Sequence, residues 1–163
     1  ADGSWADRVK VSEQTEKTSI PGILQVRRFA ERGPSGKFRA DMIYQHGQGF
    51  EQQGQLDFAS ALYQAALNLT PAEDVYWRGL AAAQLSTAHF DAARDSYARA
   101  QQINPLSAEY AIGLARTYQG GSAAQQLILA AQFYAEALRL RPADSALQAA
   151  WLKAQTLAAQ VAQ

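Results

Sequence analysis

The chain has 163 residues and carries 15 Lys and Arg against 15 Asp and Glu, so it is formally neutral near pH 7. This length predicts one domain, and neutrality argues against nucleic acid as the main ligand. No stretch approaches the roughly 20 apolar residues of a membrane-spanning helix, and the lack of cysteine excludes disulfides and thiolate metal sites. About a fifth of the chain is Ala and about a tenth is Gln, which favours helix throughout.

Residues 1–39 are predicted to be a leader, extended or with short helices, which a Gly33-Pro34 pair would end. The leader has 8 basic and 5 acidic residues, whereas the remainder has 7 and 10, so the neutral total is a cancellation of +3 and −3. We expect the basic stretch between Arg27 and Arg39 either to be solvated or to dock on an acidic surface. Because the chain begins at Ala1 rather than Met, we also expect a trimmed or processed N-terminus.

From residue 40 onward the sequence repeats with a period of about 34 residues. Pro71 and Pro105 are 34 residues apart, and Pro142 follows 37 residues later. Alanine recurs five and twelve residues before each of these prolines, and tyrosine recurs eight residues before each. Small residues let neighbouring helices approach closely and a tyrosine fills the remaining gap, so this recurrence predicts a stack of similar helical units.

Each unit is predicted to contain two helices, because a second amphipathic stretch precedes the Ala and Tyr positions. These earlier stretches have apolar or small residues at steps of three and four. The expected units are 40–73, 74–107 and 108–144, the last with a three-residue insertion near 120–122.

Residues 145–163 are predicted to form a final helix that caps the array. Asp144 or Ser145 can cap its first turn, and an apolar side that includes Trp151 and Leu152 would cover the third unit. An array needs such an end, because its last unit would otherwise expose an apolar face.

These units resemble the tetratricopeptide repeat (TPR) family over about two thirds of the chain. The second unit matches the family's signature positions best, with Trp77, Leu80, Ala81, Ala93, Tyr97, Ala100 and Pro105. The first unit departs from the signature at Ile43 and His46, where the family has a large aromatic residue and a leucine. The resemblance implies an all-α superhelix, or α-solenoid, of three helix-turn-helix repeats with a C-terminal capping helix.

The resemblance also implies a concave wall, lined by the first helix of each unit, that binds a peptide or helix of another protein. Exposed Tyr44, Val75, Leu85 and Ile112 would make part of this wall apolar. The predicted wall residues are Asp41, Tyr44, Gln48, Glu51, Gln52, Val75, Arg78, Ala82, Leu85, Glu109, Ile112, Arg116, Gln119 and Lys153.

TPR proteins that hold chaperone C-termini use a clamp of Lys and Asn on this wall. The corresponding positions here are Tyr44, Gln48 and Ala82, so a carboxylate clamp is not expected. The wall combines apolar groups with charges of both signs, which suits an amphipathic segment better than a highly charged tail.

No catalytic, cofactor or metal site is predicted, so we interpret the protein as non-enzymatic. There is no nucleophile elbow, phosphate-binding loop or dinucleotide fingerprint. His46 is expected to be a core histidine on the face toward the second helix, and His89 to be exposed. Asp91 and Asp95, with Arg94 and Arg99 beside them, are expected to form a solvated charged face.

The resemblance suggests an assembly factor for a bacterial envelope machine, such as a type IV or tight-adherence pilus or a secretion system. Such a protein would be periplasmic or on the periplasmic face of the outer membrane, with a lipid anchor upstream of Ala1, and self-association stays open. The alternatives are a cytosolic secretion chaperone or adaptor, or the regulatory TPR domain of a larger enzyme.

Overall fold

The structure is a computed structural model that describes residues 36–120 and 124–161, and every regular element in these residues is an α-helix. Residues 1–35 of the predicted leader and most of the predicted insertion near 120–122 lie outside the described residues. The helices are α3 (Gly36–Gln52), α4 (Leu56–Leu69), α5 (Asp74–Ser86), α6 (Phe90–Ile103), α7 (Ala108–Gln119), α8 (Ala124–Leu140) and α9 (Ser145–Val161).

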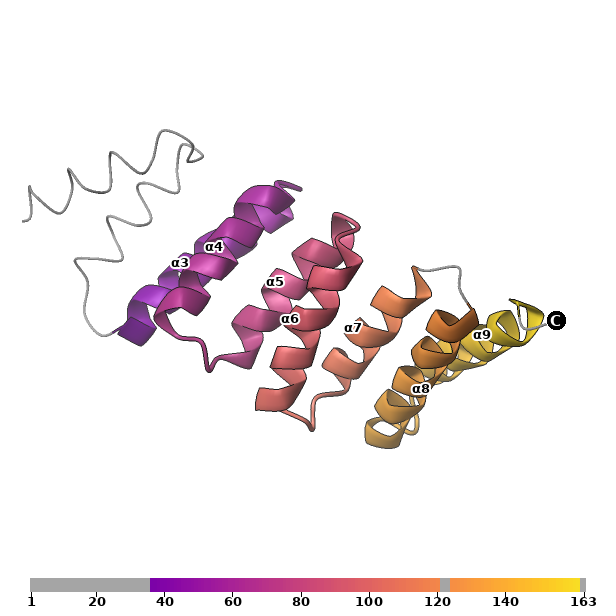
Figure 1. Ribbon diagram of the computed structural model, residues 1–163. Coiled ribbons are helices and arrows are strands. Elements are labelled where there is room, and N and C mark those ends of the chain that lie inside the picture. Colours follow the sequence, from indigo (N-terminus) through magenta and orange to yellow (C-terminus); the bar gives the residue numbers. More distant parts are fainter. Residues whose placement is uncertain (1–35, 121–123, 162–163) are drawn as a thin grey trace, which may run out of the picture.

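The helices form antiparallel pairs that stack in chain order, as Figure 1 shows. Helices α3 and α4, α5 and α6, and α7 and α8 pack as pairs, and α9 packs on α8. The first helices of successive pairs also touch, α3 against α5 and α5 against α7. This arrangement confirms the predicted all-α solenoid with a final helix.

The three repeat prolines mark where the second helix of each pair stops. Pro71, Pro105 and Pro142 each lie two residues beyond the last residue of α4, α6 or α8. Proline disfavours helical geometry in the residue before it, so it fixes the position of the turn into the next unit. One of these turns is also held by a side chain, because Trp77 Nε1 donates to the Pro71 carbonyl at 2.8 Å.

Two helix bounds differ from the expected ones. Helix α3 begins at Gly36, so Lys37 and Arg39 belong to the array and not to the leader. Lys37 pairs with Glu73, the residue before α5. Helix α8 has 17 residues against 14 in α4 and in α6. Most of the insertion is therefore an added helical turn, which satisfies its own backbone hydrogen bonds, whereas a longer loop was expected.

The repeated alanines and tyrosines form the core between the units. Tyr63, Tyr97 and Tyr134 are at most 7% exposed, and the alanines five residues before each proline are fully buried. Glycine completes this packing where a first helix crosses a tyrosine ring: a Cβ on Gly79 would lie 3.2 Å from Tyr63 Cε2. Glycine costs stability within a helix, so its presence here reflects the close approach of the ring.

Helix α9 is capped as expected, but the side of α9 that faces away from the third unit carries an exposed apolar residue. Asp144 Oδ1 accepts the backbone N–H of Leu147 at 3.0 Å, which satisfies one of the free donors of the first turn. Leu147 is buried against the third unit, whereas Leu152 is 54% exposed. The expectation that Leu152 helps cover the third unit is therefore wrong, because it points to the side where a further second helix would pack.

Candidate functional site

The predicted wall residues lie on α3, α5, α7 and α9, and we call this set the first-helix wall. Contacts join residues of α3, α5 and α7 across unit boundaries. In the centre, the Arg78 guanidinium lies 3.5 Å from the Tyr44 hydroxyl on one side and 3.9 Å from Glu109 Oε2 on the other. Arg78 therefore links α3, α5 and α7, and the wall is a continuous surface at this point.

The apolar part of the wall is smaller than the sequence suggested. Val75 is 37% exposed, and Leu85 and Ile112 are half-buried. Tyr44, which we expected to be exposed, is only 7% exposed. Its ring packs between Tyr63 and Tyr76, with centroids 5.0 and 4.9 Å away, so burial in an aromatic cluster corrects the prediction.

Hydroxyl groups of the buried tyrosines reach the wall from the second helices behind it. Tyr63 donates to Glu51 Oε2 at 2.5 Å, and Tyr134 donates to Gln119 Oε1 at 2.9 Å. Glu51 and Gln119 occupy matching positions in the first and third units, and the second unit has Leu85 there. From the sequence, these tyrosines are assigned to the core, with no contact assigned to their hydroxyl groups. Their regular spacing of eight residues from proline was a signal that each would meet the same position of the wall in its own unit.

Tyr97, the tyrosine of the second unit, faces the arginines of the wall. Burial raises the pKa of Tyr97, and the positive charges of Arg116 and Arg78 oppose that rise. Leu85 stands where the other units have Glu51 and Gln119, so it offers the Tyr97 hydroxyl no acceptor. The Tyr97 hydroxyl and the two arginines therefore make this part of the wall rich in hydrogen-bond donors.

Tyrosine and carboxylate pairs hold the first helices in register. Tyr76 of α5 donates to Asp41 of α3, and Tyr110 of α7 donates to Asp74 Oδ2 of α5 at 2.6 Å. Burial opposes ionisation of Asp74, but hydrogen bonds from Tyr110 and Asn104 outweigh it and keep the pKa of Asp74 below its usual value. Asp41 is thus a structural acceptor as well as a wall residue.

A hollow of about 160 Å³ opens between α7 and α9, beside Arg116. Its apolar lining comes from both helices and includes Ile112 of α7 and Ala146 and Ala150 of α9. The polar lining is Arg116, Tyr134 and Asp144. Sequence reasoning named Ile112 and Arg116 but missed the two alanines, which look like ordinary helix residues until α7 and α9 are brought together.

Charge is unevenly distributed along the wall. Asp41 and Glu51 lie at the α3 end, whereas Arg116 and Lys153 are exposed at the α7 and α9 end. Within residues 36–120 and 124–161, neither Arg116 nor Lys153 forms an ion pair. The wall is therefore acidic toward its first unit and basic toward its last.

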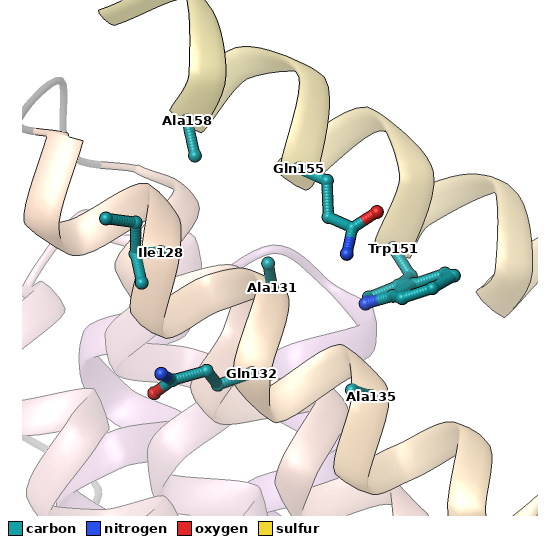
Figure 2. Close-up of a pocket in the computed structure, with 7 residues that line it drawn as sticks. All are labelled: Ile128, Ala131, Gln132, Ala135, Trp151, Gln155 and Ala158. Atoms are coloured by element: carbon teal, nitrogen blue, oxygen red, sulfur yellow. The ribbon is translucent and has the colours of Figure 1, made fainter. Parts of the chain in front are cut away.

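A second hollow of about 400 Å³ lies between α8 and α9, where a second helix of a fourth unit would pack (Figure 2). Ile128 and Ala131 line it from α8, and Trp151 and Gln155 line it from α9. In the second and third units, the position of Gln155 contacts the following helix: Gln84 accepts from Ser96, and Tyr118 stacks on Phe133 at 5.6 Å. Among the described residues, the hollow is thus the open end of the stack, and it is not part of the wall.

The histidines and the charged residues of α6 form no cluster of metal-binding side chains in the described part of the chain. His46 is exposed, with Nδ1 2.9 Å from the Met42 carbonyl, so the prediction of a core histidine is wrong: its ring lies along the surface of α3 and contacts the preceding turn. His89 is exposed, as predicted. Arg94 pairs with Asp91 and lies 5.0 Å from the Tyr118 ring centroid. No three His, Asp or Glu residues in these ranges could together hold a metal ion, and no helix there could cross a bilayer.

Comparisons with solved structures agree with this architecture. The TPR domain of OM64 from Arabidopsis is 19% identical, with a TM-score of 0.69 over 75% of this chain and 98% of that domain. The chain has the tetratricopeptide-repeat fold. The first TPR domain of Spaghetti (RPAP3), bound to the HSP90 peptide SRMEEVD, is 20% identical, with a TM-score of 0.69 over 74% of this chain and 93% of that one.

The array is also similar to a bacterial chaperone. The type III secretion chaperone SycD of Yersinia enterocolitica, in complex with a peptide of the translocator YopD, is 16% identical, with a TM-score of 0.62 over 74% of this chain and 90% of that one. No family model and no curated protein sequence matches the chain significantly.

Proposed function

We propose that the protein is a non-catalytic interaction module that holds a segment of another protein along the first-helix wall. The observation that supports this most is the hollow between α7 and α9, because it places an apolar depression beside an exposed arginine with no ion pair in the described residues. An exposed apolar depression is typical of a binding site and unusual on a surface that contacts only solvent. Two of the similar TPR structures contain bound peptides, and this agrees with the proposal.

The cellular role that we propose is assistance in assembling a bacterial envelope machine. Among the versions of this role, the likeness to SycD supports a chaperone or adaptor that holds a segment of a client protein. The role in pilus assembly, the periplasmic location and the lipid anchor stay predictions from the sequence resemblance.

Selection from a displayed library of random 15-residue peptides tests the proposal without knowledge of the natural partner. We expect enriched peptides whose affinity, measured by fluorescence anisotropy, falls at least about tenfold in the Arg78→Glu variant, because its guanidinium links three helices of the wall. Arg99, which is exposed on α6, provides the control variant Arg99→Glu. Unchanged affinity in an Arg78→Glu variant that circular dichroism shows to be folded would contradict the proposal.

A further inference from the structure

The arginine in the second unit of the wall has a carboxylate partner, whereas the arginine near α9 has none within the described residues. The Arg78 guanidinium has the Glu109 carboxylate 3.9 Å away. Arg116 has no carboxylate at ion-pair distance within the described residues, and its side chain lies at the rim of an apolar hollow. An arginine in that setting attracts an anion from a partner more strongly than one already neutralised.

The other polar groups of the hollow are engaged elsewhere. Asp144 accepts the Leu147 N–H at 3.0 Å, at the start of α9, where the partial positive charge of the helix end offsets its own charge. The Tyr134 hydroxyl donates to Gln119 and accepts a hydrogen bond from the Arg116 side chain. Arg116 is exposed, and this neutral hydroxyl leaves its positive charge uncompensated, so Arg116 is the charged group at this hollow that can attract an anion.

The volume of the hollow limits the side chain that it can take. A cavity of about 150 Å³ in another protein holds a benzene molecule, so a hollow of about 160 Å³ matches one side chain of leucine or phenylalanine size. Ile112, Ala146 and Ala150 give it apolar walls, and the two alanines leave the space open.

We propose that the hollow binds a side chain of leucine or phenylalanine size in the partner segment, and that Arg116 binds an adjacent Asp or Glu of the same segment. The acidic end of the wall around Asp41 and Glu51 then favours basic residues at the opposite end of that segment. The segment would bind in one orientation, with its acidic part at α7 and α9. This inference rests on the proposed function and specifies the chemistry of the partner.

Two variants separate the two parts of this recognition. Ala146 is exposed, so Ala146→Leu fills the hollow from its rim without disturbing the core, and Arg116→Gln removes the charge. Matched controls are Ala159→Leu on the same helix and Arg139→Gln on α8, both at exposed positions outside the hollow.

The probe is the set of peptides selected from the random library against the unaltered protein. We expect an Asp or Glu within four residues of a leucine, methionine or phenylalanine in the enriched peptides. Ala146→Leu and Arg116→Gln should each weaken their binding about tenfold, and the controls should leave it unchanged. Replacing the peptide carboxylate by its amide should weaken binding to the unaltered protein but not to Arg116→Gln.

The two levels of the proposal fail differently. A library that yields no peptide above background would overturn the proposed function, and this inference with it. Peptides that bind, lose affinity in Arg78→Glu and are indifferent to both Arg116→Gln and Ala146→Leu would overturn this inference alone.

Discussion

At the scale of single residues, the turns between paired helices show how the same backbone shape is made with different residues. Gly54 has a φ of +74° in the turn between α3 and α4, and Ala88 has a φ of +61° at the matching position between α5 and α6. The left-handed region is easily reached by glycine but is unfavourable for alanine because of its Cβ. The second unit therefore stores backbone strain that the first unit avoids.

We predict that Ala88→Gly stabilises the protein by about 0.5 to 1 kcal/mol, because removing the Cβ relieves more strain than the added freedom of the unfolded chain costs. Urea denaturation followed by circular dichroism measures this change. Gly54→Ala is the matched control and should destabilise by a similar amount. If Ala88→Gly lowered the free energy of unfolding, the strain argument would be wrong.

At the scale of helices, glycine sets how closely a first helix approaches the tyrosine behind it. A Cβ on Gly113 of α7 would lie 2.6 Å from Tyr97 Cδ1, whereas a Cβ on Gly49 of α3 would meet nothing within 4 Å. The two glycines thus have the same intrinsic helix propensity and opposite surroundings.

We predict that Gly113→Ala destabilises the array by about 1 to 3 kcal/mol, since overpacking exceeds the gain in helix propensity. Gly49→Ala should stabilise it by about 0.5 to 1 kcal/mol, because only the propensity changes. Thermal and urea unfolding of both variants measure the difference. Equal effects in the two variants would show that the Tyr97 ring moves aside without cost.

The sequence allowed the helix pairs to be predicted but not the depth at which every side chain lies. Proline, alanine and tyrosine recur in phase because each marks a contact that every unit must make, and those contacts fix the fold. Tyr44 was misplaced because helical spacing gives the face of a residue, while its burial depends on two aromatic partners from other helices. The hollow beside Arg116 was not foreseen, since most of its wall comes from α7 and α9, which are separated in the sequence by the whole of α8.

At the scale of the whole molecule, buried tyrosine hydroxyls link folding to alkaline pH. Burial raises the pKa values of Tyr63, Tyr76 and Tyr110, and hydrogen bonds to Glu51, Asp41 and Asp74 respectively raise them further. Their pKa values in the folded chain lie above the ordinary value of about 10. The neutral tyrosines therefore contribute stability that is fully present below about pH 10 and is lost as the pH rises above it.

We predict that the free energy of unfolding decreases steeply between about pH 10 and pH 12, with each of these tyrosines contributing up to about one proton to the slope. Urea denaturation at a series of pH values measures the slope. Tyr76→Phe keeps the ring but removes the hydroxyl, so it should flatten the slope by up to about one proton. A slope that is the same in Tyr76→Phe and the unaltered protein would rule out this linkage.

The position of the tyrosine hydroxyls has a thermodynamic consequence for the array. The rings of Tyr63 and Tyr134 belong to the contacts that stack the units, while their hydroxyl groups bond Glu51 and Gln119 on the wall. A stack of units unfolds as one cooperative block only where the interactions between neighbouring units are sufficiently stabilising. A ligand that binds those wall residues in the folded state would therefore strengthen the coupling between units, so that the array unfolds as one block where it would otherwise fray from its ends.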